Sequence, residues 1–243
     1  MSAAGARHAY EVNRSRIASL WAEARPVEQG DPAGRFLRSG GVEPSVSHGT
    51  WPAALRLHPA LDYWHMQANR QPACLGRFAA LLAMFELDTY PQGLGSAPEP
   101  HAVALQRIYL AADGTLAPVP VPVKLSGHAG PALGACARLA PVDGERSVMG
   151  LAVGIAPALR IARAAHIPMW AVADAPALAH ARWPRGLQHL HVFVDAHDPD
   201  QWKPAAELAR KASACGLQVY PMEVDLANTG APHKPPQFTA TRL

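Results

Sequence analysis

The hydrophobic pattern changes from helical spacing near the start of the chain to short continuous runs toward its end. Apolar residues recur three or four positions apart over residues 17–24, and Pro26 follows them, which predicts a helix that ends before this proline. Asp31 and Pro32 are the residue types preferred at a helix N-cap and first helical position, so a second helix is expected there. Residues 42–70, rich in Pro and His, are expected to be irregular.

The next region has the pattern of an antiparallel β layer. Ala73 to Phe85 is apolar enough for either a strand or a helix, and the run alone does not decide between them. Ala102 to Leu110 is a better strand, and Asp113-Gly114 after it is a favourable hairpin turn. Val119 to Leu125 alternates Val with Pro, which predicts an edge strand or an extended arm.

Residues 148–224 alternate between apolar runs and helical segments. Strands are expected at Val148–Val153, Pro168–Ala173, Leu187–Val194 and Leu217–Met222. The segments between them carry helix signals, among them Pro157 in a first turn, Asp174 as a cap and Gly216 after a helix at 203–214. This rhythm predicts an α/β fold with a doubly wound parallel sheet, preceded by a small mixed α+β region.

These patterns divide the chain into four regions. We expect an N-terminal helical and irregular region at 1–72, a small antiparallel β layer at 73–146, an α/β domain at 147–228 and a flexible tail at 229–243.

Composition narrows the class of protein. The chain is 49% hydrophobic with a net charge of +3, and no segment has the strongly basic character of a typical nucleic-acid-binding domain. Cys74, Cys136 and Cys215 show neither a CxxC spacing nor a disulfide framework, which fits a reducing compartment. There is no signal-peptide pattern at the N-terminus and no apolar stretch long enough to span a bilayer. A soluble, cytoplasmic protein with no membrane partner is therefore expected.

The strand at 189–195 ends in an acidic cluster. Carboxyl ends of strands are where α/β proteins bind ligands, and carboxylate oxygens suit Mg²⁺, so Asp195 and Asp198 are candidate metal ligands. His191, Asp195 and His197 alternate along the same strand edge, and a His–carboxylate set suits Zn²⁺ or Mn²⁺ better. The alternative for His191 is an ordinary histidine in the core or at its rim.

Several passages resemble the TOPRIM-containing, primase-like proteins of bacterial mobile elements and phages. They are Gly34–Val42, Leu55–Trp64, Ala104–Leu110 with its continuation to Lys124-Leu125, and Gly150–Leu159 followed by Phe193-Val194-Asp195. Each passage alone is short, and it is their common order and spacing along the chain that make the resemblance specific. The resemblance implies a TOPRIM-like α/β domain after a small mixed region.

The match departs from the family's catalytic pattern. The resemblance implies a general acid/base Glu at the end of the first strand, where this chain has Val153, and a second Glu where it has Ala156. It also implies an Asp-x-Asp pair that holds Mg²⁺. The first Asp is Asp195, the second position is His197, and Asp198 follows one residue later. Valine neither binds a metal nor transfers a proton, so no catalytic residue is assigned.

The resemblance therefore implies a degenerate TOPRIM protein, associated with replication of a mobile element or phage, that acts mainly by binding. DNA, RNA, a nucleotide or a replication protein are candidate partners. The alternative is a residual nucleotidyltransferase or phosphodiesterase in which Asp195 and Asp198, with His197 or Asp225, hold Mg²⁺ or Mn²⁺ weakly. A third possibility is a purely structural or inhibitory partner that keeps the fold for its surface.

Two basic residues in the β layer are candidate phosphate contacts. Arg107 and Lys124 lie in the passage that matches best, and both are expected to face the acidic edge of the TOPRIM-like domain and bind a nucleic-acid or nucleotide phosphate. The alternative is a pair of solvated surface charges. Trp64 and the other later tryptophans are expected to be core or rim aromatics.

Overall fold

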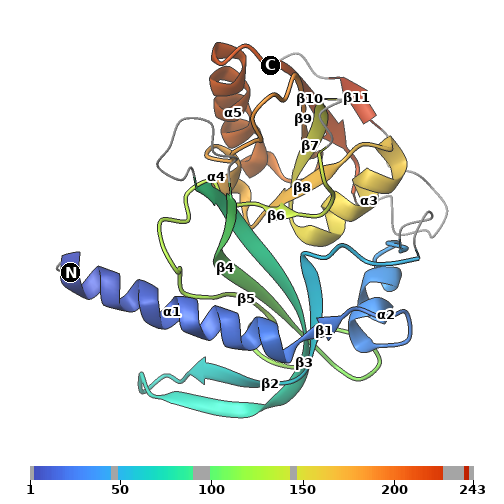
Figure 1. The fold of residues 1–243 in the computed structure, drawn as a ribbon. Coiled ribbons are helices and arrows are strands. Elements are labelled where there is room, and N and C mark those ends of the chain that lie inside the picture. The colour runs from blue at the N-terminus through green and yellow to red at the C-terminus, as the bar shows by residue number, and fades with distance from the viewer. Residues whose placement is uncertain (1–2, 45–48, 90–98, 143–146, 227–237, 241–243) are drawn as a thin grey trace. The chain divides into compact units, whose positions relative to one another are not determined.

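The computed structural model describes residues 3–44, 49–89, 99–142, 147–226 and 238–240 (Figure 1). The chain forms two compact units. The first comprises residues 1–39, 43–84 and 102–130, and the second comprises 40–42, 85–101 and 131–243. Both contain sheets, and helices pack on them, so the mixed α/β class predicted from the sequence is confirmed.

The first unit is built on a five-stranded sheet, two of whose strands extend at one end into the second unit. Its order is β1-β2-β3-β4-β5, and the registers of β1 with β2, β2 with β3 and β4 with β5 are antiparallel. The strands are β1 (Arg25–Pro26), β2 (Leu55–Met66), β3 (Pro72–Thr89), β4 (Glu99–Leu110) and β5 (Val123–Leu125). The segment that was either strand or helix is thus strand β3, and β5 is the expected edge strand. This sheet is antiparallel and is not part of a doubly wound parallel arrangement.

Strand β2 corrects the expectation that residues 42–70 are irregular. Leu55, Leu57 and Tyr63 are almost fully buried, so the segment carries the alternating apolar positions of a strand. The prolines and histidines that obscured this pattern lie at an irregularity, because the register with β3 shifts between His58 and Leu61. A bulge accommodates Pro59, which has no N–H to donate to the ladder.

Helix α1 (Ala3–Glu23) covers part of this sheet. Its residues Ile17, Leu20 and Trp21 join the cluster around Tyr63 and Tyr109. The helix begins earlier than its apolar periodicity predicts, because its first turns are rich in alanine, the best helix former.

Helix α2 (Pro32–Ser39) begins where the sequence predicted. Asp31 caps it, with Oδ1 accepting a hydrogen bond from the N–H of Gly34 at 2.7 Å.

The second unit is built on a six-stranded sheet of order β11-β10-β9-β7-β8-β6. Its strands are β6 (Ala137–Arg138), β7 (Val148–Val153), β8 (Met169–Val172), β9 (His189–Asp195), β10 (Gln218–Val224) and β11 (Phe238–Ala240). The four predicted strands, β7 to β10, pair in parallel, while β6 and β11 pair antiparallel at the two edges. Residues 238–240 of the predicted flexible tail thus form a strand, and the rest of the tail beyond residue 228 lies outside the described residues.

Helices connect the parallel strands of this sheet. They are α3 (Ile155–Ala165), α4 (Ala175–Leu178), the short 3₁₀ helix η1 (Pro199–Gln201) and α5 (Trp202–Ala214). Asp174 caps α4 as expected, accepting a hydrogen bond from the N–H of Ala177 at 2.9 Å. The core between the sheet and α4–α5 includes Leu151, Val192 and Leu208. Within the described ranges, no helix has both the length and the apolar character that crossing a membrane requires.

An arginine on β6 neutralises two carboxylates in the second unit. Arg138 Nη2 donates to Asp88 Oδ1 at 2.6 Å, and its Nε lies 3.6 Å from Glu86 Oε2. The guanidinium also lies over the Trp170 ring, 4.7 Å from its centroid. Burial raises the pKa of Glu86, and the charge of Arg138 opposes that shift. The three polar side chains therefore depend on one another in a site that is largely shielded from water.

Removing this arginine should destabilise the second unit. We expect Arg138→Ala to lower the free energy of unfolding by about 3 kcal/mol, because it leaves two poorly hydrated carboxylates without a cation. Thermal and urea unfolding measure the effect. Arg163→Ala, at an exposed position on α3, is the control and should change stability by less than about 0.5 kcal/mol. Equal stability of the two variants would contradict a structural role for Arg138.

Candidate functional site

The predicted acidic residues lie at the carboxyl edge of the parallel sheet. β7 ends at Val153 and β9 at Asp195, and the register Leu151↔Val192 makes these ends neighbours. Asp195 also pairs with Val224 at the end of β10. The structure thus brings Val153 and Asp195 to one edge, with His197 and Asp198 in the turn that follows.

Asp195 is hydrogen-bonded to residues of the turn that follows it. Its Oδ1 accepts a hydrogen bond from the N–H of His197 at 3.0 Å, and its own N–H donates to Gln201 Oε1 at 3.1 Å. The guanidinium of Arg160, on α3, also interacts with this carboxylate. Burial lowers the pKa of Arg160, and the negative charge of Asp195 opposes that shift. The positive charge of Arg160 therefore acts on this acid from a distance, since the two side chains form no ion pair among the described residues.

Arg160 was not predicted from the sequence. Its Nη2 donates to the carbonyl oxygen of Leu226 at 3.1 Å, which ties α3 to the segment after β10. Its sequence position offered one clue: Arg160 is in the second turn of the helix that follows the first parallel strand, and this helix begins at the carboxyl edge of the sheet. A single arginine in a helix carries little information without that geometry.

Asp198 acts as a local cap. Its Oδ1 accepts from the N–H of Asp200 at 3.2 Å, and its Oδ2 accepts from Gln201 Nε2 at 2.9 Å. One carboxylate oxygen thus caps η1, and the other holds the side chain of Gln201. The alternative in which Asp195 and Asp198 share one cation requires these contacts to be exchanged for metal bonds.

The two histidines of the predicted metal face make separate contacts. His197 Nε2 lies 3.0 Å from Asp225 Oδ1, in a largely exposed pair. The ring of His191 stacks on Tyr220, with centroids 4.7 Å apart. Burial lowers the pKa of His191, and neighbouring His189 adds to that shift. In the part of the chain that the structure describes, no three His, Cys, Asp or Glu side chains are grouped so that they could hold a metal ion.

The predicted phosphate contacts lie in the first unit, on β4 and β5. Arg107 and Lys124 are directly opposite each other in the antiparallel register, so they share a face of the sheet. Lys124 is engaged within the unit, because its Nζ donates to the carbonyl oxygen of Trp64 and lies 3.9 Å from the Tyr63 ring centroid. Their predicted orientation toward the acidic edge stays a prediction.

Arg107 has no carboxylate partner among the described residues. Its Nε is buried and makes no hydrogen bond. Burial lowers the pKa of Arg107, Tyr109 opposes the shift, and the positive charge of Arg16 lowers it further. Two arginines therefore lie close enough to repel each other, and the sequence analysis found only one of them. Arg16 is four residues before Leu20 on α1, so it follows from the helical periodicity once α1 is known to pack on this sheet.

These two arginines line a pocket of about 240 Å³ in the first unit. Its carboxylates are paired, since Asp62 binds Arg77 at 2.7 Å and Glu23 lies 3.2 Å from His58 Nε2. Its wall also contains Trp64, which is 49% exposed and thus an exposed aromatic, not a core one. The pocket combines an excess of guanidinium charge with an accessible aromatic ring, which suits an anion that carries a planar group.

Substitution of Asp198 can distinguish its role as a helix cap from a role as a metal ligand. Asp198→Ala should lower the free energy of unfolding by about 1 kcal/mol through loss of the cap, whereas Asp198→Asn should keep stability within about 0.5 kcal/mol because asparagine also caps well. Urea unfolding with and without Mg²⁺ or Mn²⁺ is the measurement. A metal-dependent stabilisation that Asp198→Asn abolishes would show that Asp198 is a ligand.

Residues 11–156 match the model of the family described as "Domain of unknown function (DUF7146)". Neither the curated proteins nor the solved structures yield a match to this chain. The matched segment runs from α1 through the antiparallel sheet to the first residues of α3, so it includes Arg16, Arg107 and Val153. The chain belongs to the DUF7146 family.

Proposed function

We propose that this protein is a TOPRIM-like, primase-like protein of mobile-element or phage DNA replication that binds single-stranded nucleic acid and does not carry out metal-dependent phosphoryl transfer. The observation that carries the binding function is the pair Arg16 and Arg107, which has no carboxylate partner among the described residues and lines a pocket with an exposed tryptophan.

The order of the parallel strands supports the TOPRIM-like part of this proposal. Counted along the chain, the four parallel strands lie in the order 2-1-3-4, which is the arrangement of one doubly wound class. Right-handed crossovers that leave β7 and β9 in opposite directions place α3 and α5 on opposite faces. In that class, ligands bind at the carboxyl ends of strands 1 and 3, which correspond to Val153 and Asp195.

The chemistry of that edge favours binding over catalysis. Val153 supplies neither a proton nor a metal bond, and losing a general acid/base costs about 10²–10⁴-fold in rate. Arg160 already interacts with Asp195, so a divalent cation there would be repelled by a positive charge. Asp198 is occupied as a cap. Nucleotidyl transfer through these residues would require all three features to be compensated.

The pocket of the first unit supports a single-stranded partner. A phosphate group accepts hydrogen bonds from guanidinium groups in a fixed geometry and would offset the repulsion between Arg16 and Arg107. The exposed ring of Trp64 is a surface on which an unpaired base can stack. The bases of a duplex are paired and stacked on one another, so they are not free to make this contact. Because a stacked base and a neutralised phosphate are sequence-independent contacts, we propose binding without marked sequence preference.

Replacing either arginine should weaken this binding. We expect Arg16→Gln and Arg107→Gln each to reduce affinity for a short single-stranded DNA about tenfold, through the loss of one charge-assisted contact. Each should also reduce the salt-dependence slope by about 0.7. Fluorescence anisotropy across a salt series measures both, with single-stranded RNA and duplex DNA as parallel probes.

Arg7→Gln is the matched control for this experiment, since Arg7 is an exposed arginine on the same helix and does not line the pocket. It should bind like the wild type. Arg16 is also exposed, so its replacement should not affect folding, and thermal unfolding checks the more buried Arg107. Equal losses in the Arg7 and Arg16 variants would mean that the affinity reflects general charge and not this pocket.

The absence of a metal requirement is a separate prediction. We expect single-stranded DNA binding to be the same in EDTA and in Mg²⁺ or Mn²⁺, and Asp195→Asn to leave it unchanged, because the proposed contacts involve no metal. Calorimetric titration of each metal, with and without DNA, tests this directly. Metal binding that disappears in Asp195→Asn would instead support the residual nucleotidyltransferase or phosphodiesterase.

A further inference from the structure

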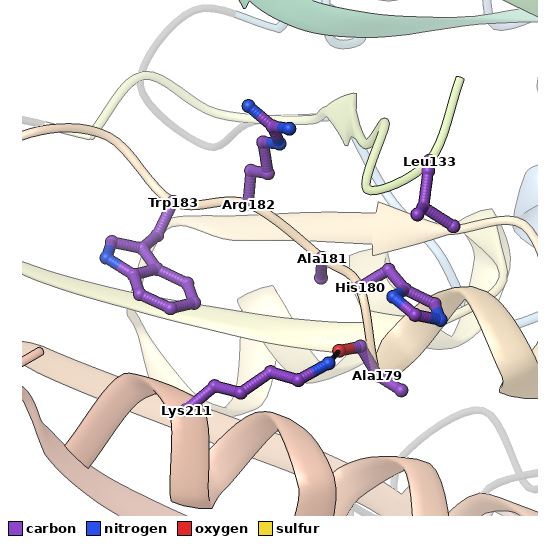
Figure 2. A pocket seen from close by; sticks show the side chains of 7 residues that line it. All are labelled: Leu133, Ala179, His180, Ala181, Arg182, Trp183 and Lys211. Carbon is purple, nitrogen blue, oxygen red and sulfur yellow. Dashed lines mark hydrogen bonds between the residues drawn. The ribbon is translucent and has the colours of Figure 1, made fainter. Parts of the chain in front are cut away.

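A second basic pocket lies entirely within the second unit. It has a volume of about 350 Å³ and is lined by residues 179–183, Leu133 and Lys211 (Figure 2). The segment 179–183 follows α4, and Lys211 is in the last turn of α5. None of these residues belongs to the carboxyl edge of the sheet or to the pocket that contains Arg107, so neither site described above accounts for it.

The charged side chains that line this pocket are all basic. Its lining includes Arg182, Lys211 and the ionisable His180, and no carboxylate. Lys211 Nζ donates one hydrogen bond, to the carbonyl oxygen of Ala179 at 2.9 Å, which leaves two N–H groups of the ammonium for a ligand (Figure 2). The guanidinium of Arg182 makes no ion pair with any carboxylate of the described residues. The pocket thus suits an anion.

The pocket also has an apolar wall. Trp183 is partly buried and packs against the core of the unit, so its ring is held in place, while Leu133 is 62% exposed. In Figure 2, Trp183 lies toward one end of the lining and His180 and Leu133 toward the other, while the Lys211 ammonium reaches between them to Ala179. A fixed indole ring provides a surface for a planar aromatic group, which separates this pocket from a plain phosphate or sulfate site.

Two backbone segments are tightly packed against each other around the pocket. The N–H of Arg182 donates to the carbonyl oxygen of Gly134 at 3.2 Å. Gly134 has a φ of 88°, and a Cβ there would lie 2.2 Å from the carbonyl oxygen of His180. Only glycine allows this approach, so the Leu133 loop and the 179–183 segment are fixed against each other.

From these features we infer that this pocket binds a nucleoside monophosphate, with the base against Trp183 and the phosphate at the Lys211 ammonium; the Arg182 guanidinium points away from Lys211 in Figure 2 and adds positive charge at a distance. A planar base and a phosphate dianion match the two kinds of surface that the lining offers. The volume falls at the lower end of the range of small-molecule sites, about 300–1,000 Å³, which fits one nucleotide better than a dinucleotide. The nucleotide is either free or the 5′-phosphorylated end of a strand.

Isothermal titration of the full chain with 5′-AMP, adenosine and inorganic phosphate tests this inference. We expect 5′-AMP to bind more tightly than either fragment, because only it uses both surfaces. Lys211→Gln should weaken 5′-AMP binding about tenfold and leave adenosine binding unchanged, whereas Trp183→Leu should weaken both about tenfold. Arg210→Gln, at the neighbouring exposed position of α5 outside the pocket, should behave as the wild type.

Two outcomes would overturn the inference. One is no 5′-AMP binding by the wild type at about 1 mM, an affinity too weak for a specific site. The other is equal binding by the Lys211 and Arg210 variants. Competition by an oligonucleotide with a 5′-phosphate, compared with the same strand with a 5′-hydroxyl, distinguishes a strand end from a free nucleotide. Arg16→Gln should leave 5′-AMP affinity unchanged, so this test is independent of the proposed single-strand binding.

Discussion

The parallel pairing of β7 with β9 is the constraint on which the second unit depends. Parallel neighbours cannot be joined by a tight turn, so every connection from β7 to β10 is a crossover of considerable length. Gly150 also lets the Met169 and Phe193 side chains pack over β7, because a Cβ there would lie 2.1 Å from Met169 Sδ and 2.8 Å from Phe193 Cε2 and would displace both. The close packing of three strands at this glycine fixes where their carboxyl ends meet, and hence where Asp195 lies relative to Val153.

The carboxyl edge of the parallel sheet also stabilises the acidic side chains that lie there, Asp195 and Asp198. A carboxylate at a strand end needs hydrogen-bond donors or a cation; Asp195 accepts a hydrogen bond from the N–H of His197, and the charge of Arg160 attracts it from a distance. Asp198 obtains donors by capping η1. The acids are therefore satisfied by the fold itself.

Local signals in the sequence predicted much of this fold, whereas contacts between residues far apart in the sequence could not be predicted from it. Asp31 and Asp174 were recognisable as caps because a cap depends on three or four consecutive residues. Strand β2 was missed because Pro59 and its neighbouring histidines interrupt an alternation that only pairing with β3 reveals. Asp198 was predicted as a metal ligand, and only the structure shows that it caps η1. The proximity of Arg16 and Arg107 depends on how α1 packs on β4, which no local pattern encodes.

The arginines of this protein differ in what neutralises them, and this difference distinguishes structural charge from charge kept for a ligand. Arg138 is held by Asp88 and Glu86 and stacks on Trp170, so its charge is used within the fold. Arg107 is similarly shielded from water but has another arginine, and no carboxylate, as its charged neighbour. Such an arrangement costs free energy in the unliganded protein and is relieved when an anion binds. A partly buried guanidinium without a carboxylate partner is therefore stronger evidence for an anionic ligand than the chain's small net positive charge, which reflects exposed and buried groups alike.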